Sequence, residues 1–384
     1  MSETVNGVFK LVKNGFGVLR EPQYSFRRQP NEVMVTAALI REHSLVPGAT
    51  ISGTARRGKK GLVLEKIESI NQLPSETFQQ RTPYTRLTAI DPFERFSLAD
   101  CGLTSMRVVD LVAPIGKGTR GLIVAPPKAG KTTILENLAA AIHHTQPDAR
   151  IIVLLVDERP EEVTHFRRAV KAEVLHSSSD QSIQEHIELV EMTMACIRTE
   201  LECGSDVVVL VDSLTRMGRA FNQRGTRTGR TMSGGLETGA LEIPRRFFGL
   251  ARAVEDGGSV TILATALVDT GSRMDEMIFE EFKGTGNSEI ILERSLAERA
   301  VFPAVNISSS GTRKEERLFK PEEYTMMTRL RRRFADMRPK EAMEELLALI
   351  ARYPTNKELI AESAEGAEKP ARKKIAPRRS IVRT

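Results

Sequence analysis

One stretch of the sequence, APPKAGKTT at residues 125–133, limits the possible folds more than any other. It joins an apolar run, RGLIVAP, to a helix-forming segment, GKTTILENLAAAIHH. A Gly-Lys-Thr turn between a strand and a helix is typical of the phosphate-binding loop G-x-x-x-x-G-K-[ST], whose backbone N–H groups surround phosphate oxygens at a helix N-terminus. Ala125 replaces the first glycine of this pattern, so the strict form is missed at one position. We still expect a nucleotide site here.

Each residue type in this loop has a chemical use toward a nucleotide. The Lys131 ammonium reaches the β and γ phosphates, and the Thr132 hydroxyl can bind Mg²⁺. The alternative is an ordinary glycine-containing turn with a surface lysine, which the strand context and a second loop lysine disfavour. The predicted phosphate site consists of Lys128, Ala129, Gly130, Lys131, Thr132 and Thr133.

Continuous apolar runs alternate with helical segments after residue 105. The runs ARIIVLLVDE, DVVVLVDS and GSVTILATALVD are typical of strands buried on both faces, so the pattern predicts a parallel, doubly wound α/β sheet. Two helices, near 321–333 and 339–352, are expected to complete this fold.

Two acidic residues follow these predicted strands and are expected at the same sheet edge as the phosphate loop. Asp212 is a candidate Mg²⁺-binding acid, although an aspartate there could instead cap the next helix. Glu158 is a candidate general base, with Arg159 beside it as a phosphate-sensing group. The alternative for Glu158 is membership of an acidic helix start.

The N-terminal part has a different pattern of apolar and polar residues. Residues 5–71 alternate apolar and polar residues in short runs separated by glycine and proline, which predicts a small β-barrel. Within it, NGFGVLR at 14–20 is either a strand that stacks nucleic-acid bases or an ordinary half-buried strand with two glycines. Residues 72–104 are typical of a linker, and the ATPase unit is expected over 105–355.

The charge is concentrated at the C-terminus. The segment 361–384 has little to bury and is predicted to be disordered. From residue 366 onward it carries seven basic residues and one acid, which accounts for the whole net charge of +6. The body is therefore near neutral, and its overall charge does not indicate a nucleic-acid-binding surface.

Membrane and secretory classes are not expected. The sequence has no apolar run long enough to span a bilayer, and its start lacks the pattern of a signal peptide. Its three cysteines share no metal-ligand spacing. We therefore expect a cytoplasmic protein with no membrane partner.

Several long segments, in order, resemble the transcription termination factor Rho family. The resemblance runs from about residue 5 to about residue 350. It implies a bacterial homohexameric ring with an OB-fold, cold-shock-like RNA-binding barrel and a RecA-type P-loop ATPase domain. Such a ring is an ATP- and Mg²⁺-dependent RNA translocase, or helicase, that binds nascent single-stranded RNA and releases it from RNA polymerase. The segments are GLIVAPPKAGKTT, LLVDERPEEV, VDSLTRMGRAFN, RRFFGLARAVEDGGSVTILATALVDTGSRMDE, EEFKGTGNSEI and VFPAVN…SGTRKEE.

The resemblance also implies individual roles. Arg313 matches an arginine finger that acts on the ATP of a neighbouring subunit, so the implied catalytic set is Lys131, Glu158, Asp212 and Arg313, with Thr132 and Asp212 at the metal. Phe302 matches an aromatic residue that packs against adenine. A segment that lines the family's nucleotide pocket is matched by Gly116, Lys117, Gly118, Thr119, Arg120 and Gly121. The implied RNA contacts are Phe16, Arg20, Arg227, Arg230, Thr270, Gly271 and Arg273.

The chain departs from the family pattern in the barrel. Val18 and Met34 stand where the family usually has aromatic residues. Because stacking contributes roughly 1–3 kcal/mol per base, we expect weaker base-selective loading. Two other functions stay open: an RNA-binding ring regulator with weak or lost hydrolysis, and another RecA-type motor such as a rotary ATP-synthase subunit or a DNA recombinase.

Overall fold

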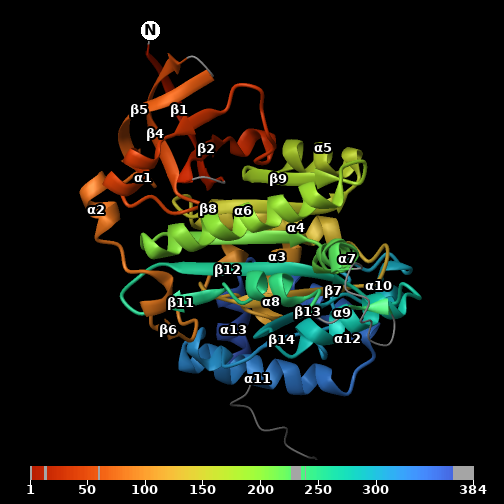
Figure 1. Ribbon diagram of the computed structural model, residues 1–384. Helices are drawn as coiled ribbons and strands as arrows, with labels where there is room; N and C mark the ends of the chain where they lie inside the picture. The colour runs from red at the N-terminus through yellow and green to blue at the C-terminus, as the bar shows by residue number, and fades with distance from the viewer. Residues whose placement is uncertain (1, 13–14, 59–60, 226–234, 238, 366–384) are drawn as a thin grey trace, which may run out of the picture.

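A computed structural model describes residues 2–12, 15–58, 61–225, 235–237 and 239–365 (Figure 1). Within these ranges a small barrel stands at one corner of a larger α/β unit. None of the described helices combines the length and apolarity needed to cross a bilayer. The architecture expected from the sequence, a small β-barrel joined to a larger α/β unit, is confirmed.

The barrel is a closed sheet of five strands in the order β1-β2-β3-β5-β4. Its interior is filled by apolar side chains such as Phe9, Val35 and Ile51, none of which is exposed. Gly17 is required there, because a Cβ atom at this position would lie 2.0 Å from the Phe9 ring. The elements are β1 (Ser2–Leu11), β2 (Gly17–Arg20), η2 (Pro22–Tyr24), β3 (Val33–Val35), α1 (Ala37–Glu42), β4 (Thr50–Gly58) and β5 (Gly61–Ile70).

The segment expected to be a linker is partly built into the larger unit. Its strand β6 pairs with β11, at the edge of the ATPase sheet. We therefore propose that the linker ends at β6 rather than at residue 104. The elements are α2 (Ser75–Gln79), η3 (Tyr84–Arg86), β6 (Ala89–Ile90), η4 (Leu98–Cys101) and α3 (Thr104–Val112).

The ATPase sheet has a parallel centre, as the continuous apolar runs predict. The main path of the strands is β14-β13-β7-β12-β10-β8-β9, and all neighbours from β13 to β9 run parallel. Two further strands are antiparallel to their neighbours: β14 pairs with β13, and β11 pairs with both β12 and β6. The bounds are β7 (Arg120–Ala125), β8 (Arg150–Glu158), β9 (Glu173–Ser178), β10 (Asp206–Asp212), β11 (Arg252–Val254), β12 (Ser259–Leu267), β13 (Ser288–Ile291) and β14 (Gly311–Thr312).

Helices cover both faces of this sheet (Figure 1). Successive strand residues alternate between two apolar cores, so that Leu122 and Ile123, for example, pack on opposite faces. One face is covered by α3, α4 (Lys131–Thr145), α5 (Pro160–Ala169), α10 (Arg294–Ala297), α11 (Pro321–Ala335), α12 (Pro339–Arg352) and α13 (Asn356–Glu365). The other face is covered by α6 (Ile183–Glu202), α7 (Leu214–Gly225), α8 (Glu242–Phe248) and α9 (Arg273–Lys283). The short turn η6 (Glu315–Arg317) follows β14.

The prediction of disorder from residue 361 is wrong for 361–365, which belong to α13. The helix is anchored before that point: Leu359 is fully buried, and Asn356 exchanges hydrogen bonds with Arg107. The remainder of the predicted tail, 366–384, lies outside the described residues.

The barrel packs closely on the ATPase unit. A Cβ atom at Gly48 would lie 2.2 Å from the backbone of Ala195 on α6. Phe26, in the segment after β2, is 1% exposed and belongs to the core of the larger unit. These contacts place the barrel directly against α6.

Candidate active site

The phosphate loop lies where the sequence places it, between the end of β7 and the start of α4. Gly130 has a φ of 91° and Lys128 a φ of 66°, which turn the backbone sharply before Lys131 begins the helix. Ala125, the residue that breaks the strict pattern, is the last residue of β7 and is fully buried beside β12. The small alanine side chain is thus accommodated in the core at this position. Thr132 and Thr133 lie in the first turn of α4.

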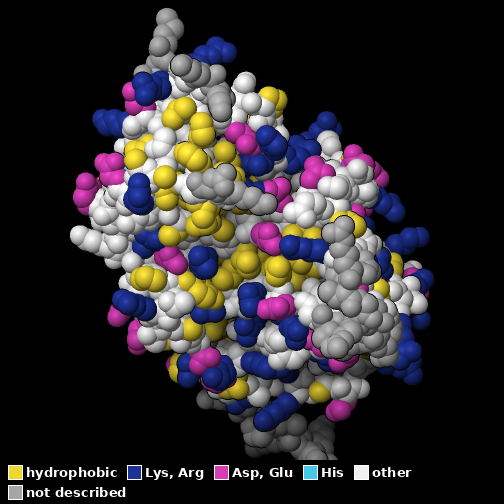
Figure 2. Space-filling view, in the orientation of Figure 1, with side chains coloured by type: hydrophobic (Ala, Val, Ile, Leu, Met, Phe, Trp, Pro, Cys, Tyr) yellow, Lys and Arg dark blue, Asp and Glu magenta, His cyan; other side chains and the backbone are white. Residues whose placement is uncertain are grey.

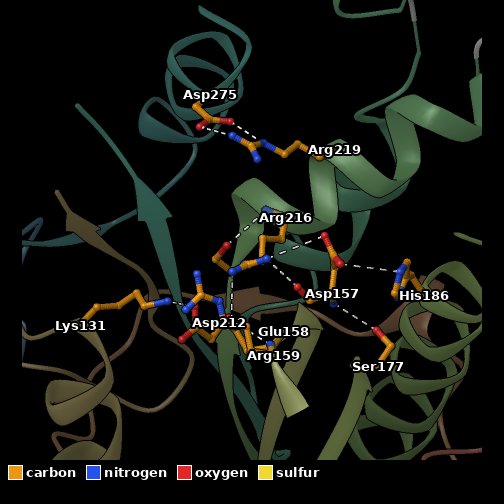
Figure 3. Close-up of polar contacts among 11 residues, drawn as sticks. Lys131, Asp157, Glu158, Arg159, Ser177, His186, Asp212, Arg216, Arg219 and Asp275 are labelled. Carbon is orange, nitrogen blue, oxygen red and sulfur yellow. Dashed lines mark hydrogen bonds and ion pairs between the residues drawn. The ribbon is translucent and has the colours of Figure 1, made fainter. Parts of the chain in front are cut away.

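The predicted metal-binding acid and the loop lysine meet in the structure (Figure 3). The Lys131 Nζ donates to Asp212 Oδ1 at 2.6 Å, and the Thr265 hydroxyl donates to the same oxygen at 2.9 Å. Asp212 is fully buried at the end of β10. Its other carboxylate oxygen is buried with no hydrogen-bond partner among the described residues. A buried carboxylate oxygen of this kind is suited to a cation, directly or through bound water.

Glu158, the candidate general base, ends β8 beside this pair and is also fully buried. Its Oε1 accepts hydrogen bonds from Arg216 Nη2 at 3.0 Å and from the Arg159 backbone at 3.2 Å, whereas Oε2 has no partner in the described chain. Burial raises the pKa of Glu158 to about 7, and the Asp212 carboxylate adds to the increase, while the Lys131 and Arg216 cations oppose it. A carboxylate with a pKa near neutrality is suited to accept a proton.

Arg216 is a site residue that the sequence analysis missed. It lies on α7, four residues after Asp212, and its Nη1 donates to the Asp157 carbonyl at 2.7 Å. The signal was an arginine one helical turn beyond a strand-end aspartate, which returns the side chain toward the strand. Only the placement of α7 over β8 shows that it reaches Glu158 (Figure 3).

The donor set fits a divalent cation. Carboxylate oxygens of Glu158, Glu162 and Asp212 lie within 4.8 Å of one another. Mg²⁺ prefers oxygen ligands, and Glu158 and Asp212 each have one buried carboxylate oxygen without a hydrogen-bond partner among the described residues. Thr132, the other predicted metal ligand, lies in the first turn of α4, directly after Lys131.

The remaining candidates on this side surround the loop. Phe302 is 55% exposed, and its ring lies 3.9 Å from the position of a Cβ atom on Gly130, so an aromatic face borders the loop. Lys128 is exposed on the loop itself, and Arg159 is exposed at the start of α5. These positions are compatible with the expected contacts, which are adenine for Phe302 and phosphate for Lys128 and Arg159.

The segment Gly116–Gly121, which the family resemblance assigns to a nucleotide pocket, lies away from the chain's own phosphate loop. It lies at the start of β7, and the loop follows the other end of that strand. A six-residue strand separates its ends by roughly 20 Å. Lys117 is instead engaged by Glu94 at 2.6 Å and Asp206 at 2.9 Å.

Arg313 lies at this same far edge. Its backbone donates to the Asn287 carbonyl at 2.7 Å, and Asn287 in turn is hydrogen-bonded to Arg120 at the start of β7. Arg313 therefore lies near the start of β7, whereas Lys131 follows the end of that strand. Within one chain it cannot act on the nucleotide.

The two predicted RNA-binding residues of the barrel differ in exposure. Phe16 is 43% exposed, as a stacking residue requires. Arg20 is 7% exposed, pairs with Glu32 at 3.0 Å and donates to the Phe26 carbonyl at 3.1 Å, so it is not a free surface cation. Val18 lies directly opposite Met34 in the β2–β3 register. The two departures from the family pattern therefore fall on one spot of the barrel.

The second set of RNA candidates is partly described. Arg227 and Arg230 lie outside the described residues. Thr270, Gly271 and Arg273 are exposed at the start of α9. The Thr270 hydroxyl donates to Asp275 at 2.7 Å, and Asp275 also pairs with Arg219 of α7 at 2.5 Å. The turn before α9 is thus tied to the helix that carries Arg216 (Figure 3).

Comparison with known proteins agrees with both parts of the fold. The family described as ATP synthase alpha/beta family, nucleotide-binding domain, matches residues 105–312. The family described as Rho termination factor, RNA-binding domain, matches residues 5–76. Among solved structures, an ATPase of the type III secretion system of pathogenic bacteria has a TM-score of 0.61 at 20% identity, with 81% of this chain and 93% of that chain covered. This likeness concerns the fold alone.

Curated relatives match nearly the whole chain. Transcription termination factor Rho of Aquifex aeolicus is 48% identical over 364 residues, which covers 93% of this chain and 84% of that protein. The Rho protein of Pseudomonas aeruginosa is 46% identical over 362 residues, with 92% and 86% covered.

A P-loop with a buried acid pair, on a RecA-like sheet that follows an RNA-binding barrel, defines a nucleic-acid-associated P-loop ATPase. The sequence relationships narrow this class to one family. The chain belongs to the transcription termination factor Rho family.

Proposed function

We propose that this protein terminates transcription as an RNA-dependent ATPase that binds nascent single-stranded RNA, moves along it and releases it from RNA polymerase. The observation that carries this proposal is the meeting of Lys131, Asp212 and Glu158 at the phosphate loop of a chain with an RNA-binding barrel. Sequence relatives named transcription termination factor Rho support the same function.

The chain's own residues suggest how ATP would be cleaved. Backbone N–H groups of 129–133 and the Lys131 ammonium would hold the phosphates. Thr132 and Asp212 would hold Mg²⁺, which would supply positive charge to neutralise the phosphates. Glu158 would accept a proton from the attacking water as the bond between the γ-phosphorus and the bridging oxygen breaks. Its pKa of about 7 leaves a substantial fraction of this carboxyl ionised at neutral pH.

Arg313 would complete the site from a neighbouring subunit. Because it lies at the opposite sheet edge from Lys131, its guanidinium can stabilise the transferring phosphoryl group only across an interface. The fold therefore favours a ring in which each P-loop edge faces the Arg313 edge of the next copy, and we propose the homohexamer of the family.

Mixing two inactive variants tests the shared site. Lys131→Ala lacks the phosphate lysine, and Arg313→Ala lacks the trans arginine, so each alone should have no RNA-stimulated ATPase activity. In a mixed ring about a quarter of the head-to-tail interfaces regain both groups, and activity should reappear. Activity of the Arg313→Ala ring alone would contradict the trans role.

Transcript release tests the full function. Elongation complexes of a bacterial RNA polymerase, halted on a long transcript, should release RNA with the wild-type protein and ATP but not with Lys131→Ala. The second candidate, a ring regulator without hydrolysis, would bind RNA while the wild-type ATPase rate stays at background. The buried, pKa-shifted Glu158 argues against it.

A further inference from the structure

A groove of about 420 Å³ lies between α6, α8 and β11, away from the phosphate loop. Its floor is apolar, with Met194, Ala195 and Leu250 among the lining residues, and the ring of Tyr84 forms part of one wall. Figure 2 shows hydrophobic side chains in the middle of this face, bordered by Lys and Arg side chains. The cationic lining residues are Arg198, Arg246 and Arg252.

Tyr84 is held in place as an aromatic wall. Its backbone N–H donates to Glu202 at 3.0 Å, and the guanidinium of Arg252 lies 4.3 Å from the centre of its ring. Arg252 itself donates to the Gly249 carbonyl, while its buried Nε has no hydrogen-bond partner in the described part of the chain. The wall thus combines an aromatic ring with a positive charge, which suits a planar, anionic ligand.

Negative charge around the groove is limited. Glu202 lies 3.8 Å from Arg198 but is already held by Arg81 at 3.0 Å. Glu242 pairs with Arg246 at 2.5 Å, one helical turn away on the exposed surface of α8. Exposed pairs of this kind are weak and exchange readily for a phosphate. The groove thus combines an aromatic wall, an apolar floor and a cationic rim.

The position of the groove indicates which anion it would take. Ala195, on its floor, is the residue against which the barrel packs at Gly48. At its other end, α8 is tied to α9 by the pair Arg245–Glu281, and α9 begins at Arg273. The groove therefore lies between the barrel and the second predicted RNA contact.

We propose that this groove binds a segment of single-stranded RNA on its way from the barrel to the second predicted RNA contact, at Thr270, Gly271 and Arg273. A base would lie against Tyr84 and the apolar floor, and phosphates would bind Arg198 and Arg246. Stacking on an aromatic residue and backbone contacts to arginine are the usual means of binding single strands without sequence preference. This inference rests on the proposed function, because it assumes that RNA passes along this face.

The test uses the double variant Arg198→Ala/Arg246→Ala, since both side chains are exposed and lie outside the ATP site. Binding of a labelled oligo(U) of 60 nucleotides is measured by fluorescence anisotropy over a range of salt concentrations. Loss of two phosphate contacts should lower the salt-dependence slope by about 1.4 and weaken binding on the order of tenfold at low salt. The matched control is Arg245→Ala, also on α8 but paired with Glu281 away from the groove.

A second measurement does not depend on variants. RNA carrying 4-thiouridine is photo-crosslinked to the wild-type protein, and the crosslinked peptide should contain Tyr84. An unchanged slope and affinity in the double variant, or equal losses with Arg245→Ala, would overturn the proposal. Dissociation of the double variant's oligomer, measured by light scattering, would also overturn the proposal, because the groove would then be a contact between copies of the chain.

The two proposals can fail separately. If RNA fails to stimulate the wild-type ATPase while the double variant still loses RNA affinity, the proposal that the groove binds RNA is supported and the proposed function is contradicted. If RNA stimulates the wild-type ATPase and the double variant binds RNA as tightly as the wild type, only the proposal that the groove binds RNA is contradicted.

Discussion

The buried carboxyl of Glu158 should make stability depend on pH in a way that Glu158→Gln removes. In the folded, nucleotide-free chain its pKa is about 7, against an ordinary value of 4.5. A raised pKa in the folded state favours the protonated form. Its contribution to stability is therefore complete below pH 4.5 and is lost as the pH rises through 7. The difference of about 2.5 pKa units corresponds to about 3 kcal/mol.

Glutamine cannot ionise, so the stability of the variant does not fall with pH through this group. As the pH rises from 4.5 to 8, the free energy of unfolding of Glu158→Gln should increase by about 3 kcal/mol relative to that of the wild type. For a chain of this size that corresponds to roughly 4 °C in unfolding temperature. The assay is thermal unfolding without nucleotide or Mg²⁺ across this pH range, with the exposed Glu161→Gln as control. A difference from wild type that is the same at pH 5 and pH 8 would refute the reasoning.

Further predictions concern the site and the barrel. RNA-stimulated ATPase activity should rise with pH around 7, because Glu158 has to be ionised to accept a proton; a flat profile from pH 6 to 8 would count against this role. Lys131→Ala should abolish turnover and also lower the unfolding temperature, since it leaves the buried Asp212 carboxylate without its cation; adding Asp212→Asn should restore stability but not activity. Val18→Phe should tighten RNA binding, measured by anisotropy, and no change would mean that β2 is not the loading surface. Gly17→Ala should destabilise the barrel by about 1–3 kcal/mol in denaturant unfolding, because its methyl group would overlap the Phe9 ring.

The parts of the site that the sequence predicts are those fixed by sheet topology. In a parallel sheet the ends of neighbouring strands meet at one edge, so a strand-end glutamate, a strand-end aspartate and the loop lysine have to converge. Lys131, Asp212 and Glu158 do so. The continuous apolar runs likewise predict strands buried on both faces, and β7, β8, β10 and β12 are the result.

The parts that the sequence misses depend on how elements are placed in space. The contact of Arg216 with Glu158 is set by the orientation of α7 over the sheet. Arg20 belongs to the same alternating series as Phe16, yet the segment that follows β2 folds over it through Phe26 and Glu32 and buries its guanidinium. The family pattern assigns Gly116–Gly121 to a nucleotide without stating whose, and only the structure shows that the segment and the chain's own phosphate loop lie at opposite ends of β7.

The central claim is that RNA drives ATP hydrolysis at this P-loop. The most direct measurement is the steady-state ATPase rate of the wild-type protein with RNA homopolymers, with single-stranded DNA and without nucleic acid, with Lys131→Ala as the blank. The account predicts a rate at least about tenfold higher with one or more RNA homopolymers than with DNA or no nucleic acid, and no turnover by the variant. Equal rates with and without RNA, or stimulation by DNA alone, would contradict it.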